Sequence, residues 1–507
     1  MRLRAPPKHT NNVNVWADEA IWGHRFYNDQ TPWCVFLEFL AVFRSRLEFG
    51  CALDEHREND IHEVFEYSIP RLRPLRQLIF NNPQIRYIED TQQSDTNRWN
   101  KWQSAMEEGG DFSYLQNRFR SFEHLARVIE FFQTTAIEPN RQRRWTSRFL
   151  FPYGPDCLYA DLPANVHGSP DRRFFARGGE LLYLMLSRSG RGPEIAKKMS
   201  KLLAPNSTWN EVVKVLLPDN ENVRQEQVST EIGYLPFADR PEYSDLASTW
   251  LRLLDLNLPA ESLLDPLMRL SILHMLIYML RRSDEETGNE TEPRFVLEVA
   301  SPRRTTLFEI SSENLAANRM LPSRAVRAYV KSIEHDQEWV EALRMRVPVA
   351  AAAKLLENRY HWRPASGGAY GDPEPLLQEL SIYAESRHQQ HVAKVHLEWS
   401  KQIGLTVSRR GTGTWYSPND ALLKALVLCI VDEGREEYHR FLGRLYERFN
   451  LVVGPSEAAR AFGSLPTDQN VFVQNTQRLE HRLKTLGLLR RLSDDCAYVE
   501  NPFGNRQ

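Results

Sequence analysis

Hydrophobic and polar residues follow a changing period along the C-terminal end of the chain. Apolar residues three and four apart predict helices, and short β-branched runs predict strands. In order, the pattern predicts a helix over 436–449, a strand over 451–453, a short helix over 454–462, a longer helix over 468–486, and apolar segments over 488–492 and 497–501. Gly487 ends the longer helix, and the turn at 493–495 joins the last two segments into a hairpin.

The rest of the chain has mainly helical periods with a few β-rich runs. The predicted helices lie at 33–43, 119–134, 173–203 with a break at 189–193, 243–256, 263–282, 323–356, 376–399 and 419–432. We expect hairpins over 295–310 and 405–416, a loop or exposed helix over 94–111, and a solvated acidic loop over 283–292. The fold class is therefore mainly α: a multi-domain helical body with small β hairpins.

Chain length and the positions of glycine- and proline-rich segments suggest how this body is divided into domains. A chain of 507 residues is too long for one ordinary core. We predict an N-terminal helical domain over 1–165, a middle helical domain over 166–363, a linker over 364–375, a helical connector over 376–434 and a C-terminal domain over 435–507.

Composition narrows the class of protein. Apolar residues at 42%, charged residues at 26% and a net charge of −2 are typical of a folded protein whose surface is not broadly basic, so any nucleic-acid contact must be a local patch. The five cysteines are scattered without a CxxC pair, which favours a reducing compartment. The N-terminus has no apolar run of a signal peptide, and charged residues interrupt the apolar helix at 263–280. We expect a soluble, cytoplasmic protein with no membrane contact.

From residue 469 onward the chain resembles the winged helix-turn-helix domains of bacterial DNA-associated proteins. The third helix, the break Leu486-Gly487-Leu488-Leu489 and the hairpin ending Val499-Glu500-Asn501-Pro502 carry the resemblance. It implies that the third helix enters the major groove and that the hairpin, or wing, touches the DNA backbone. As a whole, the chain is only loosely similar to accessory subunits of bacterial anti-phage defence and restriction islands.

Polar residues of the third helix and the wing are the candidate DNA contacts. Asn and Gln can pair with adenine and Arg with guanine, while Arg and Lys also bind phosphates. The outward candidates on the helix are Gln474, Asn475, Gln477, Arg478, His481, Arg482 and Lys484, followed by Arg490 and Arg491 as phosphate anchors. The wing tip, Asp494-Asp495, is acidic and would repel a phosphate backbone.

Metal chemistry has weaker candidates. Glu385, His388 and His391 are three apart on one predicted helix, a spacing that carboxylate and histidine metal sites use, and His396 follows. No second motif supplies further ligands, so we expect no metal and no cofactor. Glu298 and Glu309 on the predicted hairpin at 295–310 would suit a metal-dependent nuclease, but the lysine that such a core needs is missing. Phosphate-loop, zinc-protease and serine-hydrolase motifs are also absent from the sequence.

Two arginine clusters are further candidates for phosphate binding, with ion pairing as the alternative. The first is Arg141, Arg143, Arg144 and Arg148 around Trp145, and the second is Arg71, Arg73 and Arg76.

These patterns predict a non-enzymatic DNA-binding or scaffold subunit of a multiprotein DNA-processing or anti-phage defence system. Its partners would be double-stranded DNA and other protein subunits. The first alternative is a protein–protein adaptor whose winged helix docks a partner subunit, which the near-neutral charge of the C-terminal domain keeps open. The second is a metal-dependent nuclease whose site is assembled only in space.

Overall fold

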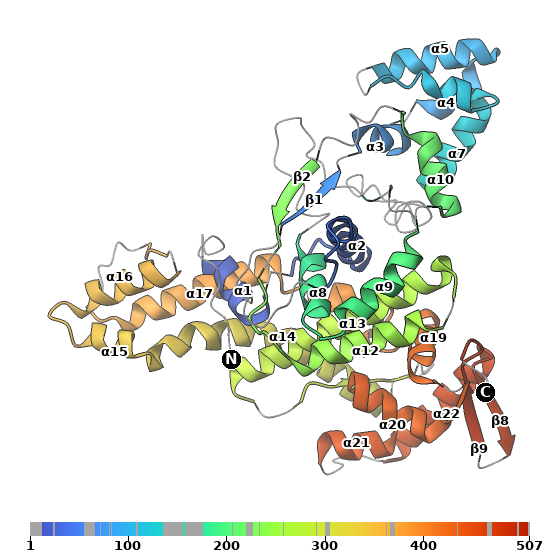
Figure 1. Ribbon diagram of the computed structural model, residues 1–507. Coiled ribbons are helices and arrows are strands. Elements are labelled where there is room, and N and C mark those ends of the chain that lie inside the picture. Colours follow the sequence, from blue (N-terminus) through green and yellow to red (C-terminus); the bar gives the residue numbers. More distant parts are fainter. Residues whose placement is uncertain are drawn as a thin grey trace.

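The computed structural model shows a mainly helical protein with a few small sheets (Figure 1). It describes residues 13–23, 26–54, 66–70, 72–80, 82, 84–107, 110–134, 156, 158, 176–204, 206–219, 227–232, 234–256, 258–289, 292–299, 305–360, 362–365, 371–432, 434–463, 469–493 and 496–504. One large hydrophobic cluster contains residues from Ala17 to Val499. The predicted domain boundaries stay a prediction.

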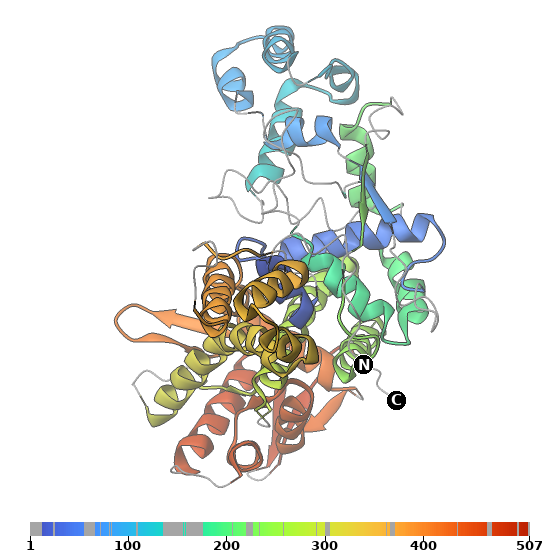
Figure 2. The same cartoon turned by 90° about the vertical axis from the view of Figure 1, so that its left-hand side faces the viewer.

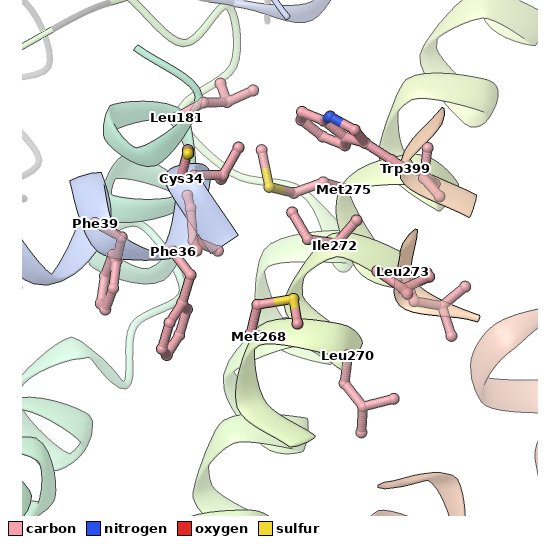
Figure 3. Packing of buried hydrophobic residues seen from close by; sticks show 14 of the residues in the cluster. Cys34, Phe36, Phe39, Leu181, Met268, Leu270, Ile272, Leu273, Met275 and Trp399 are labelled. Carbon is pink, nitrogen blue, oxygen red and sulfur yellow. The ribbon is translucent and has the colours of Figure 1, made fainter. Parts of the chain in front are cut away.

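The core is built around four apolar helices: α2 (Pro32–Glu48), α8 (Gly178–Ser187), α12 (Pro241–Leu254) and α13 (Ala260–Thr287). The predicted buried helix at 33–43 is confirmed, because α2 buries residues on almost every side. Figure 3 shows side chains of α2, α8 and α13 meeting with Trp399 in this core. Burial of so many aliphatic and aromatic side chains is the main stabilising contribution.

Helix α13 corrects one expectation. The acidic run at 283–292 was expected to be a solvated loop, but α13 continues to Thr287 and ends at Gly288. The reason is helical spacing, because Arg282 pairs with Glu285 and Glu286, three and four residues later. Ser283 is buried and accepts a hydrogen bond from Trp22 Nε1 at 3.1 Å. By length and composition α13 could cross a membrane, yet 89% of its most apolar window is buried within the protein, as in a core helix.

The N-terminal half adds a group of short helices and one small sheet. The helices are α1 (Val13–Trp22), α3 (Arg73–Phe80), α4 (Ile85–Thr91), α5 (Asp95–Met106), α6 (Tyr114–Arg118), α7 (Phe122–Thr134), α9 (Gly192–Leu202) and α10 (Thr208–Leu216). Strands β1 (Glu66–Pro70) and β2 (Gln227–Glu231) pair antiparallel. The segment at 94–111, expected as a loop or exposed helix, forms α5, and it buries Trp99 and Trp102.

The expected hairpin at 295–310 is not formed. Strand β3 (Phe295–Val296) pairs in parallel with β7 (Leu451–Val452), and α14 (Thr306–Lys331) begins where the second strand was expected. The hydroxyl of Thr305 caps α14 by accepting the N–H of Phe308 at 3.1 Å. Buried residues at helical spacing along α14 outweigh the β-rich composition of its first turns.

Helix α14 leads into a helical lobe that projects from the body (Figure 1). It contains η4 (Ser332–His335), α15 (Gln337–Leu343), α16 (Pro348–Tyr360) and α17 (Glu374–His391). The single helix expected over 376–399 is divided into α17 and α18 (Val395–Ile403). Asn28 explains the break, since its side chain binds the carbonyl of Gln390 and the N–H of Lys394.

After α18 the chain follows the expected pattern closely. Strands β4 (Thr406–Arg409) and β5 (Gly413–Tyr416) form the predicted antiparallel hairpin, and α19 (Asp420–Ile430) follows.

The C-terminal elements occur in the predicted order. They are α20 (Tyr438–Phe449), β7, α21 (Pro455–Phe462), α22 (Gln469–Thr485), β8 (Leu489–Ser493) and β9 (Cys496–Glu500). The first helix begins at Tyr438 instead of 436, because β6 (Arg435–Glu437) forms a strand before it. The sheet order is β6-β9-β8, so the hairpin is joined by the strand that precedes α20, while β7 pairs with the body.

Candidate nucleic-acid interface

Helix α22 is fastened to the body by Asn475. This side chain is fully buried and makes hydrogen bonds to the backbone N–H of Val299 at 2.8 Å and the carbonyls of Leu297 and Val453, both at 2.9 Å. The expectation that Asn475 points outward is therefore wrong. Its amide supplies both the donors and the acceptor that these buried backbone groups need.

The opposite face of α22 carries a row of exposed polar side chains. Gln474, Gln477, His481 and Lys484 are spaced three, four and three residues apart, so they share one helix face, and all four are exposed. The row contains no acidic residue. Gln474 accepts a long 3.5 Å hydrogen bond from Arg478, and no side-chain partner is found for Lys484 within the described part of the chain.

Arginines on the side of α22 that faces the body are engaged with acids. Arg482 donates to Asp420 Oδ1 at 2.7 Å and to the carbonyl of Pro418 at 2.9 Å. Arg478 lies 3.9 Å from Glu298 Oε1. These pairs tie α22 to the start of α19 and to the segment after β3, which makes both arginines less available to a ligand.

Glu298 is a buried carboxylate beneath this side of α22. Burial raises its pKa, while the Thr305 hydroxyl, Arg478 and Arg409 act in the opposite direction. Thr305 donates to Glu298 Oε1 at 2.8 Å. Glu309, its candidate partner in the alternative nuclease site, is instead exposed in the first turn of α14, so the two do not share a hairpin.

Strand β8 places two more arginines beside α22. Arg491 donates to the carbonyl of Ser493 at 3.1 Å and lies 3.5 Å from Glu480. Arg490 is exposed, and no partner is found for its side chain within the described ranges. The wing tip, Asp494-Asp495, lies outside the described residues.

Open hollows lie on both sides of the exposed row. One, of about 460 Å³, is lined by Val299, Gln474, Gln477, Arg478, His481 and Arg482. The other, of about 490 Å³, is lined by residues of α20, α22 and β8: Tyr438, His439, Val473, Thr476, Gln477, Glu480, His481, Lys484 and Arg491. Because Gln477 and His481 border both, this row forms the ridge between the two hollows, and an elongated ligand could contact either side of it.

The histidine-rich helix α17 does not bring its candidate metal ligands together. Glu385 binds Ser323 at 3.0 Å and Arg327 at 2.6 Å. His388 is buried and lies 3.2 Å from Asp18, while the ring of His391 stacks on Tyr27. Throughout the described ranges, no three His, Cys, Asp or Glu side chains gather as metal ligands. Four described cysteines, Cys34, Cys51, Cys429 and Cys496, carry free thiols.

The side chains of both arginine clusters fall outside what the structure describes. Arg71 and the cluster around Trp145 are not among the described residues, and the side chains of Arg73 and Arg76 are not described either. The sequence could not identify the acids that face α22, because Glu298 and Asp420 are far from it in sequence.

Comparison with known proteins adds no assignment: no protein family model matches the chain, and no curated protein matches it.

Proposed function

We propose that this protein is a non-enzymatic DNA-binding subunit that contacts duplex DNA through α22 and β8. The observation that carries the proposal is the acid-free row of exposed side chains Gln474, Gln477, His481 and Lys484, with hollows on both sides. Glutamine amides can bind base edges in the major groove, which is wide enough to admit a helix.

Lys484 and Arg490 are the preferred phosphate contacts within this proposal. Both are exposed and no side-chain partner is found for either among the described residues, so neither must break an ion pair to bind DNA. Arg478 and Arg482 would have to separate from Glu298 and Asp420 first. Among the cations of α22 and β8, Lys484 and Arg490 should therefore supply most of the electrostatic contribution to binding.

Fluorescence anisotropy of labelled duplex DNA tests the proposal, with salt raised from about 50 to 200 mM. We expect the wild-type protein to bind, and Lys484→Ala/Arg490→Ala to weaken binding about tenfold and to reduce its salt dependence. The matched control is Arg344→Ala/Lys354→Ala, which removes the same charge from exposed positions in the lobe. The absence of wild-type binding at low salt would overturn the proposal.

A protein-docking role is the second candidate, and a specific observation favours it. Val473 is 40% exposed and Leu492 is 55% exposed beside the same surface, and apolar side chains of this kind suit a protein interface. Association with a protein partner that is insensitive to salt and is lost in Val473→Ser/Leu492→Ser, without any DNA affinity, would favour this role. Membership of a multiprotein DNA-processing or defence assembly, and a cytoplasmic location, belong to the proposal as well.

A further inference from the structure

A basic hairpin stands near α22 on the side away from β8. Strands β4 and β5 form a hairpin that projects from the body as the orange ribbon on the left of Figure 2. Residues 408–413, which form its outer end, are all exposed. The turn is closed by a 3.1 Å hydrogen bond from the N–H of Thr412 to the carbonyl of Arg409. Gly411 and Gly413 have φ of +78° and +121°, which suits glycine and keeps the tip narrow.

The chemistry of this hairpin suits phosphate. The sequence has no acidic residue between Glu398 and Asp420, whereas the hairpin carries Arg409 and Arg410. Arg410 is exposed with no partner found within the described ranges, and the guanidinium of Arg409 lies 5.7 Å from the Trp415 ring centroid. Hydroxyl groups of Ser408, Thr412 and Thr414 lie on the same strands and turn.

The same features argue against a protein partner at this tip. No large apolar side chain of residues 406–416 is exposed, whereas the centre of a protein interface normally contains apolar or aromatic groups. Arginines, small hydroxyl side chains and backbone N–H groups are the usual contacts to DNA phosphates.

Backbone contacts place the base of the hairpin next to α22. The N–H of Glu298 donates to the carbonyl of Tyr416 at 2.9 Å, and the next N–H, of Val299, donates to Asn475 on α22. Arg478 from α22 lies 3.9 Å from Glu298 Oε1, and Arg409 from the hairpin lowers the pKa of the same carboxyl. The hairpin and α22 thus flank the segment that lines the first hollow.

We propose that the β4–β5 hairpin is a second arm of the nucleic-acid interface, which binds the phosphate backbone on the side of α22 opposite to β8. This inference rests on the proposed function, since it assumes that α22 binds a duplex. On the side where Arg478 and Arg482 are held by acids, the hairpin adds Arg410, which is exposed and has no partner found among the described residues.

The test is anisotropy with labelled duplex DNA and the full-length protein. Three proteins are compared from about 50 to 200 mM salt: wild type, Arg409→Ala/Arg410→Ala, and Arg344→Ala/Arg346→Ala. Arg344 and Arg346 are exposed in the lobe, between α15 and α16, so the two double variants change net charge equally. We expect the hairpin variant to bind about tenfold more weakly, with a salt slope smaller by about one to two, and the lobe variant to bind like wild type. Arg410→Ala alone should also weaken binding and reduce the salt slope, and it leaves the contact of Arg409 with Trp415 in place.

The outcomes separate the two proposals. If wild type binds and the Lys484/Arg490 variant is weakened, but the hairpin variants match wild type in affinity and slope, the second arm is overturned and the proposed function stands. Equal weakening of the hairpin and lobe variants would reflect net charge alone and would also overturn the second arm. If wild type fails to bind at low salt, the proposed function fails and the second arm fails with it.

Discussion

The carboxyl group of Glu38 in α2 accepts a 2.7 Å hydrogen bond from the backbone N–H of Gly179, in the first turn of α8. It also accepts the N–H of Arg177 at 2.9 Å. A helix leaves these first N–H groups without partners, so Glu38 caps α8 from the neighbouring helix. Glu180 lies in the same buried cluster, where it accepts a 2.6 Å hydrogen bond from the hydroxyl of Tyr67 and pairs with Arg177.

The first prediction concerns the pH dependence of stability at this cap. Burial, together with the charge of Glu180, raises the pKa of Glu38 from 4.5 to about 8, although hydrogen bonds from Gln30, Gly179 and Arg177 act against the rise. The folded protein therefore holds a proton that the unfolded chain loses. The contribution of Glu38 is fully present below pH 4.5 and is lost as pH rises to about 8, a difference on the order of 5 kcal/mol at most.

Replacing Glu38→Gln should flatten the fall in stability between these pH values. Urea unfolding at several pH values measures it, and the slope against pH is the readout, because the amide can change absolute stability by itself. Glu48→Gln is the control, since Glu48 lies at the exposed end of the same helix and pairs with Arg44. An unchanged slope in Glu38→Gln would contradict the assignment.

The second prediction uses the close packing of α2 against α8. A Cβ atom on Gly179 would lie 2.6 Å from the carbonyl oxygen of Val35 and against the backbone nitrogen of Phe39. Gly179→Ala should therefore destabilise the protein by about 3 kcal/mol or more, because two backbones must separate. Gly443→Ala in α20 meets open space and should be neutral or stabilising by up to about 1 kcal/mol. Thermal melting compares the two, and equal effects would refute the packing argument.

A third prediction concerns the anchor of α22. Asn475→Ala leaves the N–H of Val299 and the carbonyls of Leu297 and Val453 without their buried partner. We expect a loss of about 3 kcal/mol in the free energy of unfolding. Gln474→Ala, at the exposed neighbouring position, should change stability by less than about 0.5 kcal/mol. Hydrogen exchange of α22 amides would show whether the loss is local, and wild-type stability in Asn475→Ala would rule out the anchor.

The fourth prediction concerns the loss of folding stability at acidic pH. His396 is buried, lies 3.2 Å from the hydroxyl of Tyr416, and has its pKa lowered by burial from 6.5 to about 3. Because the unfolded chain binds this proton at higher pH than the folded protein, stability is full above pH 6.5 and falls as pH drops toward 3.

His396→Gln should reduce this fall by about 1.4 kcal/mol per pH unit between these limits. Melting curves from pH 7 to 4 test it, with exposed His335→Gln as the control. An acid sensitivity equal to that of wild type in His396→Gln would show that this histidine does not carry the effect.

Local patterns in the sequence were sufficient for most of the helices. The apolar run of α2, the Ser189-to-Pro193 break between α8 and α9, and the glycine turn of β4–β5 all predict the observed elements. These features depend on residues close in sequence, so periodicity and turn chemistry identify them. The order of elements from α20 to β9 was predicted for the same reason.

Contacts between residues distant in sequence decided the features that local sequence patterns could not predict. The β-rich run after residue 304 became the start of α14 because Thr305 caps it and the core receives its apolar face. The sequence pattern places Asn475 on the outward face of its helix, but in the folded protein its side chain is buried against Val299 and Val453. Likewise, the ion pair of Arg482 with Asp420 cannot be predicted from neighbouring residues. The sequence alone determined most of the helices and strands, since these depend on neighbours in the chain, but not the start of α14, the end of α13 or the break between α17 and α18. Only the tertiary structure decided which polar side chains of α22 are buried, paired or exposed, because burial and ion pairing depend on groups distant in sequence.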